Sequence, residues 1–84
     1  MVDSFIVTDR KTFIEFLGLL TEELKHCPDK WENKTLEGFL EAMTRYADDI
    51  QGYYDNVERS EKVNADTPSW RTFADILGGT RVYE

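Results

Sequence analysis

The feature that most constrains this chain is the spacing of apolar residues between Trp31 and Val57. If each residue turns by about 100° around a helix axis, apolar side chains recur within roughly 40° of one line. They are those of Leu36, Leu40, Met43, Ala47, Ile50 and Tyr54, with Phe39 and Val57 just outside. The pattern predicts a helix over residues 35–56, capped by Asn33 or Thr35, that turns this line towards the core.

The same helix is predicted to carry carboxylates along one flank, about 100 to 140° from the apolar line. They belong to Glu37, Glu41, Asp48 and Asp55, and we call them the acid row. No basic residue interrupts the row. Such a row is most often a solvated helix face, but it is also a surface that a basic protein would recognise.

Two tyrosines, Tyr46 and Tyr53, fall on the opposite edge of the apolar line. We expect their hydroxyls near the surface. One interpretation makes them boundary residues that hydrogen-bond to the third helix. The other makes them contact residues, because tyrosine is enriched in protein interfaces. We therefore group both with the acid row as candidate partner-binding residues.

A first helix is predicted over residues 10–25. Thr8 or Asp9 can cap it, and Pro28 ends it because the residue before a proline is pushed out of the helical region. Its buried stripe is Phe13, Phe16, Leu17, Leu20 and Leu24. Gly18 lies within this helix, where its missing side chain would let another helix approach closely.

A last helix is predicted over residues 68–82, with Thr67 as the cap and Pro68 at the first helical position. Its apolar face is Trp70, Phe73, Ala74 and Leu77. The pair Gly78-Gly79 leaves the end open, because a helix can stop at glycine or pass through it. We expect it to continue, at least in part, towards Tyr83.

The remaining segments are short. Residues 1–8 are predicted to lie across the core, anchored by Phe5 and Ile6. Trp31 and Trp70 are both predicted to be largely buried, because a core this small needs its largest side chains. The charged residues 57–66 read as a solvated connection. The whole chain is predicted to be one all-α domain, residues 1–84, of about three helices.

Composition narrows the classes of function. The chain has 17 acidic and 10 basic residues, a net charge of -7. This charge disfavours nucleic acids and anionic membranes and favours basic partners. No secretory signal or membrane-length apolar run is present, so we expect a cytoplasmic protein. The single cysteine cannot form an internal disulfide.

No reaction chemistry is legible in the sequence. The only histidine, His26, is followed by Cys27, and neighbours at a helix end point in different directions, which does not suit a nucleophile and its base. Cys27 is expected to be a small buried or half-buried apolar residue. Zinc patterns, an EF-hand loop and a glycine-rich phosphate loop are all missing. We therefore expect a protein that is not an enzyme and holds no metal or cofactor.

Two motifs carry a resemblance. The first, W-E-N-x-T-L-x-x-F-L-E-A, runs from Trp31 to Ala42, and the second, P-S-W-x-x-F-A-D-I-L, runs from Pro68 to Leu77. With the C-terminal R-V-Y-E they resemble a family of small uncharacterised bacterial proteins, a domain of unknown function. The resemblance covers nearly the whole chain and implies a compact free-standing unit, with no activity to carry over. That family often has another residue in place of Gly78-Gly79.

Three hypotheses follow for the function. The first is a non-catalytic binding domain whose acid row engages a basic protein, such as a toxin blocked by an immunity-type or antitoxin-type inhibitor. The second is a small ligand-binding domain or enzyme with a pocket between the helices near the two tryptophans. The third is a structural subunit of a larger assembly. The sequence does not indicate an oligomeric state.

Overall fold

The computed structural model describes residues 5–56 and 63–83 of the chain. They form the helices α1 (Arg10–His26), α2 (Leu36–Asn56) and α3 (Trp70–Thr80), with a short 3-10 turn, η2 (Pro28–Lys30), after α1. No strand occurs in these two ranges. The prediction of an all-helical fold with three principal helices is confirmed.

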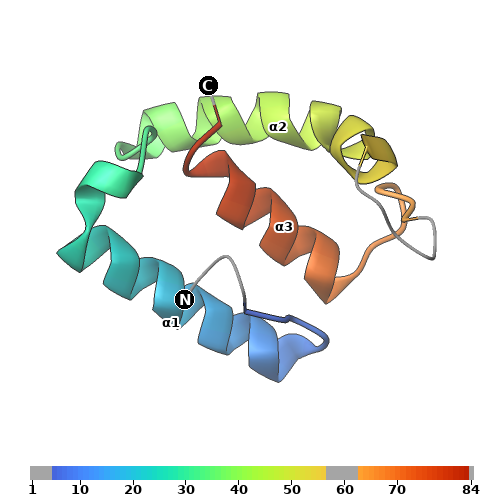
Figure 1. Ribbon diagram of the computed structural model, residues 1–84, viewed down its shortest axis with the longest axis horizontal. Helices are drawn as coiled ribbons and strands as arrows, with labels where there is room; N and C mark the ends of the chain where they lie inside the picture. Colours follow the sequence, from blue (N-terminus) through green and yellow to red (C-terminus); the bar gives the residue numbers. More distant parts are fainter. Residues whose placement is uncertain (1–4, 57–62, 84) are drawn as a thin grey trace.

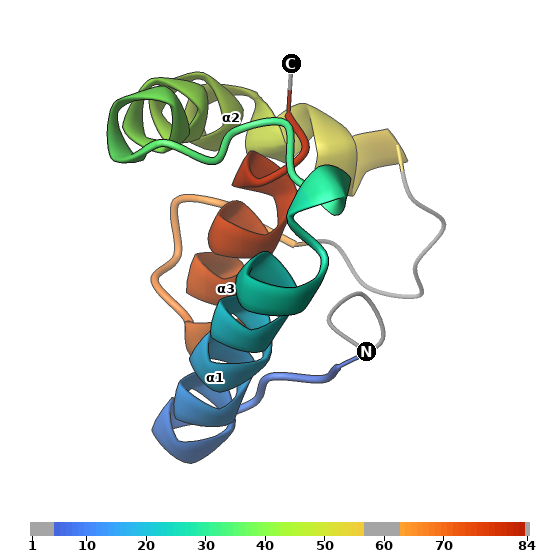
Figure 2. The same cartoon turned by 90° about the vertical axis from the view of Figure 1, so that its left-hand side faces the viewer.

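The shortest and last helix, α3, lies between the other two. Figure 1 shows α2 along the top, α1 at the lower left and α3 running between them. α3 packs against both α2 and α1. The long α2 carries the strongest sequence pattern, but α3 is the element around which the others are placed. In Figure 2 the described N-terminal segment before α1, residues 5–9, passes along one side of α1 and α3. We call this segment the lead.

Local signals set the bounds of α1. Asp9 is the cap, and its Oδ1 accepts a hydrogen bond of 2.8 Å from the backbone N–H of Thr12. The Thr12 hydroxyl in turn accepts from the backbone N–H of Asp9, which completes a capping box. The bond from the Thr12 backbone is the main reason why the pKa of Asp9 lies below its usual value. The helix ends at His26, and Pro28 opens η2.

The core lies where α1, α3, the lead and the link after η2 meet. Its buried members are Val7, Phe16, Leu20, Trp31 and Ala74. Trp31 is only 7% exposed and stacks on Phe39 with ring centroids 5.9 Å apart, so its predicted burial is confirmed. Leu17 of the predicted α1 stripe is 39% exposed.

The lead does cross the core, but one predicted anchor is wrong. Phe5 is half-buried and faces Phe16, whereas Ile6 is 75% exposed and Val7 is 4% exposed. Alternate side chains of an extended segment point to opposite sides, so Phe5 and Val7 face the core together and Ile6 faces away. Residues 1–4 lie outside the described part of the chain.

The first half of α2 buries a different side from the predicted apolar line, and the second half buries that line as predicted. Ile50 and Tyr54 are buried as expected, but Leu36 is 75% exposed, Leu40 is 51% exposed and Ala42 is fully buried. Ala47 is exposed too. Ala42 lies about 120° from the predicted line on a helical wheel, whereas Ile50 and Tyr54 lie on or near it, so the buried side turns around the helix between its first and second halves. Thr35 caps α2, since its hydroxyl accepts from the Gly38 N–H at 3.1 Å.

α3 begins two residues later than predicted. Its cap is Ser69, whose hydroxyl accepts from the Thr72 N–H at 3.0 Å, and not Thr67. Pro68 therefore precedes the cap and is not the first helical residue. The helix passes through Gly78-Gly79, as expected in part, and ends at Thr80.

The two glycines of α3 explain how closely the helices approach. A Cβ added at Gly79 would overlap the ring of Tyr46 on α2, and one added at Gly78 would lie 3.2 Å from Phe16 Cζ on α1. Nothing lies within 4 Å of the corresponding point at Gly18. The close approach predicted at Gly18 is therefore wrong, because α3 meets its neighbours through its own glycines.

The predicted burial of Trp70 is also wrong. Trp70 is 38% exposed and packs on Phe13, with centroids 5.4 Å apart, and on Phe73 at 5.9 Å. As the first residue of α3 it lies at the end of the helix, where neighbouring elements cover only part of the ring. Cys27 likewise differs from expectation, because it is exposed.

The connection before α3 is held in its second half. Residues 57–62 of the predicted solvated segment lie outside the described residues. Beyond them, the side chain of Gln51 donates to the Val63 carbonyl at 2.8 Å and accepts from the Ala65 N–H at 2.7 Å. One side-chain amide of α2 therefore fixes residues 63–65.

Candidate interaction surface on the second helix

The acid row lies on the open side of α2. Glu37, Glu41, Asp48 and Asp55 are all exposed. Asp55 accepts a hydrogen bond of 3.1 Å from Gln51 Nε2. Within residues 5–56 and 63–83, no ion pair involves any of the four carboxylates. The row is therefore a solvated negative stripe that cations of this described surface do not neutralise.

An exposed apolar stripe runs beside the acid row. Because the first half of α2 buries the side of Ala42 instead, most of the predicted core line there faces solvent. Leu36 and Leu40 are 75% and 51% exposed, Ala47 is exposed and Met43 is half-buried. We call these four residues the apolar seam. It lies about 60 to 160° from the acid row around the helix, so both are open on adjoining sides of α2.

The two candidate tyrosines lie on the other side of α2. Tyr53 is 47% exposed, and Tyr46 is half-buried against α3. Burial is the main cause that raises the pKa of Tyr46, with the nearby Tyr53 and Asp75 adding to it. The six candidate residues therefore form two separate groups, four carboxylates on one side and two tyrosines on the other. One flat partner surface could not cover both.

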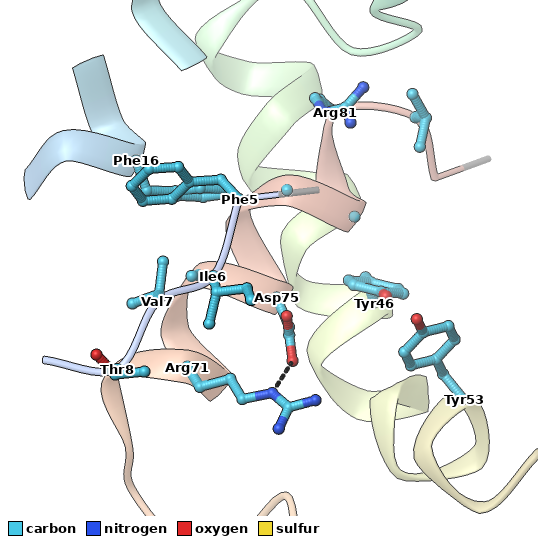
Figure 3. Close-up of a pocket in the computed structure, with 14 residues that line it drawn as sticks. Phe5, Ile6, Val7, Thr8, Phe16, Tyr46, Tyr53, Arg71, Asp75 and Arg81 are labelled. Atoms are coloured by element: carbon cyan, nitrogen blue, oxygen red, sulfur yellow. Dashed lines mark ion pairs between the residues drawn. The ribbon is translucent and has the colours of Figure 1, made fainter. Parts of the chain in front are cut away.

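The tyrosines border a cavity of about 520 Å³. Figure 3 shows Tyr46 and Tyr53 facing Asp75 and Arg71 of α3, with the lead along the other edge. The wall combines aromatic and aliphatic carbons from Phe5 to Val7 with these polar groups. Neither tryptophan lines it. The sequence predicted a pocket near the tryptophans; this cavity lies elsewhere, and Trp70 borders a separate, more open hollow beside Arg10 and Ile14 of α1.

Two charged groups of the cavity, Arg71 and Asp75, form an ion pair. Arg71 Nε lies 3.9 Å from Asp75 Oδ2, the ion pair drawn dashed in Figure 3. The hydroxyl of Tyr54 donates to the same carboxylate at 2.6 Å. Burial and this bond raise the pKa of Tyr54 far above its ordinary value. Asp75 thus links α2 to α3 at the floor of the cavity.

A buried charge cluster joins the ends of α1 and α3, and sequence reasoning missed it. Arg81 Nη1 lies 3.2 Å from Glu23 Oε1, with side chains only 6% and 11% exposed. The same Glu23 oxygen accepts from Trp31 Nε1 at 2.7 Å. Glu23 lies next to the apolar positions of α1, and Arg81 continues the stripe of α3. A charged residue on the apolar side of each helix is the sequence pattern that could have predicted this ion pair.

The segment after η2, residues 31–33, hydrogen-bonds to the C-terminal end of α3 and the residues that follow it. Asn33 Nδ2 donates to the carbonyls of Thr80 and Tyr83 at 2.8 and 2.7 Å. The Arg81 carbonyl accepts from the backbone N–H groups of Glu32 and Asn33. These bonds give Trp31-Glu32-Asn33 a structural role, and they occupy Asn33, the other cap proposed for α2.

The described residues offer no further cluster of chemically reactive side chains. His26 Nε2 lies 3.1 Å from Glu22 Oε2 on the exposed side of α1. Among the residues that the structure places, no three His, Cys, Asp or Glu side chains converge as metal ligands would. None of the described helices is both long enough and apolar enough to cross a membrane.

The fold and this surface define a small all-helical domain with an acidic and partly apolar helix face open to solvent. The chain belongs to a family of unknown function, DUF7660, whose model matches residues 9–84. The match spans all three helices and agrees with the resemblance to a family of unknown function. No significant match was found among curated proteins or among solved structures.

Proposed function

We propose that this protein is a non-catalytic binding domain that engages a basic protein through the acid row. The observation that carries the proposal is the pairing of that row with exposed leucines on the same helix. Leu36 and Leu40 are the most exposed large apolar side chains of α2. Apolar groups exposed beside uncompensated charge are typical of a surface that a partner covers.

The charge supports a basic partner in particular. The net charge of -7 sets up a long-range field, and the acid row concentrates negative charge on one side of α2. Such a field speeds encounters with a positively charged surface by ~10- to 1000-fold and repels acidic competitors. The acid row would therefore contribute mainly to the rate of association.

An immunity-type or antitoxin-type inhibitor is the specific form that this proposal takes. Such an inhibitor covers the cationic active site of a toxin, and a small acidic domain needs only shape and charge to do so. The partner would then be a basic enzyme. A basic subunit of a larger assembly would use the same surface.

The test compares two double charge reversals with equal changes in net charge. Glu41→Lys with Asp48→Lys alters the acid row, and Glu15→Lys with Asp29→Lys alters exposed acids on α1 and η2. Wild type and both variants are used as bait in cell lysate, and captured proteins are identified by mass spectrometry. We expect a basic protein that the wild type and the α1/η2 variant retain and the acid-row variant loses. Equal capture by all three would refute the proposal.

The cavity favours a second candidate function, binding of a small ligand. Its volume lies within the usual range of ligand sites, and its lining combines the polar side chains of Tyr46, Tyr53 and Arg71 with apolar ones. Screening a fragment library by amide chemical shifts tests this candidate. Shifts confined to the cavity residues would support it, and a library with no such hit would remove it.

A further inference from the structure

We infer that the apolar seam and the acid row together recognise one amphipathic helix of the partner, with lysines or arginines along one flank. This inference rests on the proposed function and specifies what the basic partner presents. It is drawn from the spacing of the seam, from the absence of a competing binding mode on this face, and from the position of the charges.

The seam has the spacing of a helix–helix contact. Leu36, Leu40, Met43 and Ala47 follow one another at intervals of four, three and four residues. This is the spacing of the contact positions in a coiled coil, where each side chain enters a gap between side chains of the facing helix. The seam spans 11 residue steps, about 16 Å along the axis. Three turns of a partner helix would cover it.

Other modes of peptide recognition do not fit this face. Addition of a strand needs an open sheet edge, and no strand exists in the described ranges. Proline-rich segments dock on grooves lined with aromatic rings. The seam contains leucine, methionine and alanine and no aromatic residue. A helix is the element that buries such a narrow aliphatic stripe.

The charges decide between a basic partner and a second copy of this chain. Glu37 lies directly beside the seam, and Glu41 and Asp48 lie further round the helix on the same side, over the same three turns. In an antiparallel pair of α2 helices the two acid rows would face each other, and like charges in contact oppose association. A helix with lysines or arginines on the facing flank would meet opposite charges along its length. The seam would then slow dissociation while the acid row speeds association.

The test uses a designed peptide as the probe. The peptide has about 18 residues, leucines at intervals of four and three, lysines along one adjoining flank and alanines elsewhere. A scrambled peptide of the same composition is the control. Binding is measured by calorimetry and located by amide shifts. We expect the designed peptide to bind at least about 10-fold more tightly than the scrambled one and to shift residues 36–48.

Variants of the protein separate the seam from general stickiness. Leu36→Ala with Leu40→Ala should weaken binding of the designed peptide by about 10- to 100-fold. Ile6→Ala with Ile14→Ala removes two side chains that are 75% and 59% exposed elsewhere and should leave binding unchanged. All four positions are exposed, so circular dichroism should show folded proteins throughout.

The outcomes distinguish this inference from the proposed function. Equal binding of the designed and scrambled peptides would overturn recognition of a helix, and capture from lysate that depends on the acid row would still support a basic partner. Equal loss in both leucine and isoleucine variants would also overturn the role of the seam. A dimer in light scattering that the leucine variant abolishes would assign the seam to a second copy.

Discussion

Single residues of α3 set the distance between the helices. Gly79 allows the backbone of α3 to lie directly on the ring of Tyr46, and Gly78 does the same for Phe16. Neither glycine adopts a positive φ, so their value is space and not backbone freedom. A side chain added at Gly79 would therefore require the Tyr46 ring or α3 to move.

Alanine at Gly79 should therefore destabilise the fold. The added methyl group must displace Tyr46 or move α3, at a cost of ~1–3 kcal/mol in the free energy of unfolding. Gly52→Ala is the matched control, because nothing lies within 4 Å of its added Cβ and the helix gains ~0.5–1 kcal/mol. Urea unfolding measures both. A stable Gly79→Ala protein would show that the contact with Tyr46 is loose.

Buried tyrosines should make the fold sensitive to alkali. The pKa values of Tyr46 and Tyr54 are both raised above the ordinary 10.0, because burial favours the neutral phenol. A raised pKa in the folded state means that this stabilisation is complete below pH 10 and is lost as the pH rises above it. The free energy of unfolding should therefore fall steeply above pH 10.

Replacing Tyr54 by phenylalanine tests whether Tyr54 causes the loss of stability at alkaline pH. Tyr54→Phe removes the ionisable hydroxyl and its bond to Asp75, so it should lower stability at neutral pH and flatten the alkaline decline. Tyr53→Phe is the control, since Tyr53 is 47% exposed. Unfolding curves at a series of pH values measure the slope. The same alkaline slope in Tyr54→Phe and wild type would rule out Tyr54 as a contributor.

At the scale of elements, one side chain of α2 organises the connection to α3. Gln51 bonds to the Val63 carbonyl and to the Ala65 N–H, and also to Asp55. Because its amide nitrogen donates to one backbone group of the loop and its amide oxygen accepts from another, this glutamine holds the loop at two points. The start of α3 depends on where this loop ends.

Gln51→Ala should release that connection. We expect amide exchange of Ala65 to accelerate markedly, while amides in the middle of α1 keep their protection. Hydrogen exchange followed by NMR measures both regions. Thr44→Ala is a control on the same helix, since its hydroxyl bonds only within α2, to the Leu40 carbonyl. Unchanged exchange at Ala65 in the Gln51 variant would show that the Gln51 side chain does not hold this segment.

The existence of each helix was predictable because its signals are local. The proline at 28 and the periodic apolar residues placed α1 within one residue of its observed end, and Thr35 was among the expected caps of α2. The cap of α3 was missed because Thr67 and Ser69 offer the same chemistry two residues apart. Only the contact with Thr72 selects Ser69.

The buried faces were less predictable because they depend on contacts distant in the sequence. A helical wheel predicts the burial of Leu36 and Ala42 from their polarity and spacing alone, without the position of the neighbouring helix. The structure buries Ala42 because α3 docks there, which needs the glycines of a helix some 36 residues later. The acid row was predicted correctly as an exposed flank, since charged residues are seldom buried without a partner of opposite charge.

At the scale of the whole molecule, the three helices and the lead give the two sides of α2 different surroundings. Tyr46 and Tyr53 face the cavity bordered by α3 and the lead. The apolar seam and the acid row face away from that cavity, and most of their side chains are exposed. The first half of α2 therefore has one side that packs against the rest of the fold and another side that is exposed to solvent.

The most direct test of that division is the association rate of the captured partner as a function of salt concentration. For the wild type, the rate should fall steeply between low and physiological salt, because screening shortens the reach of the acid row. Glu41→Lys with Asp48→Lys should associate at least about 10-fold more slowly at low salt, with a much weaker salt dependence and an unchanged free energy of unfolding. Equal rates and equal salt dependence for the two proteins would contradict the account.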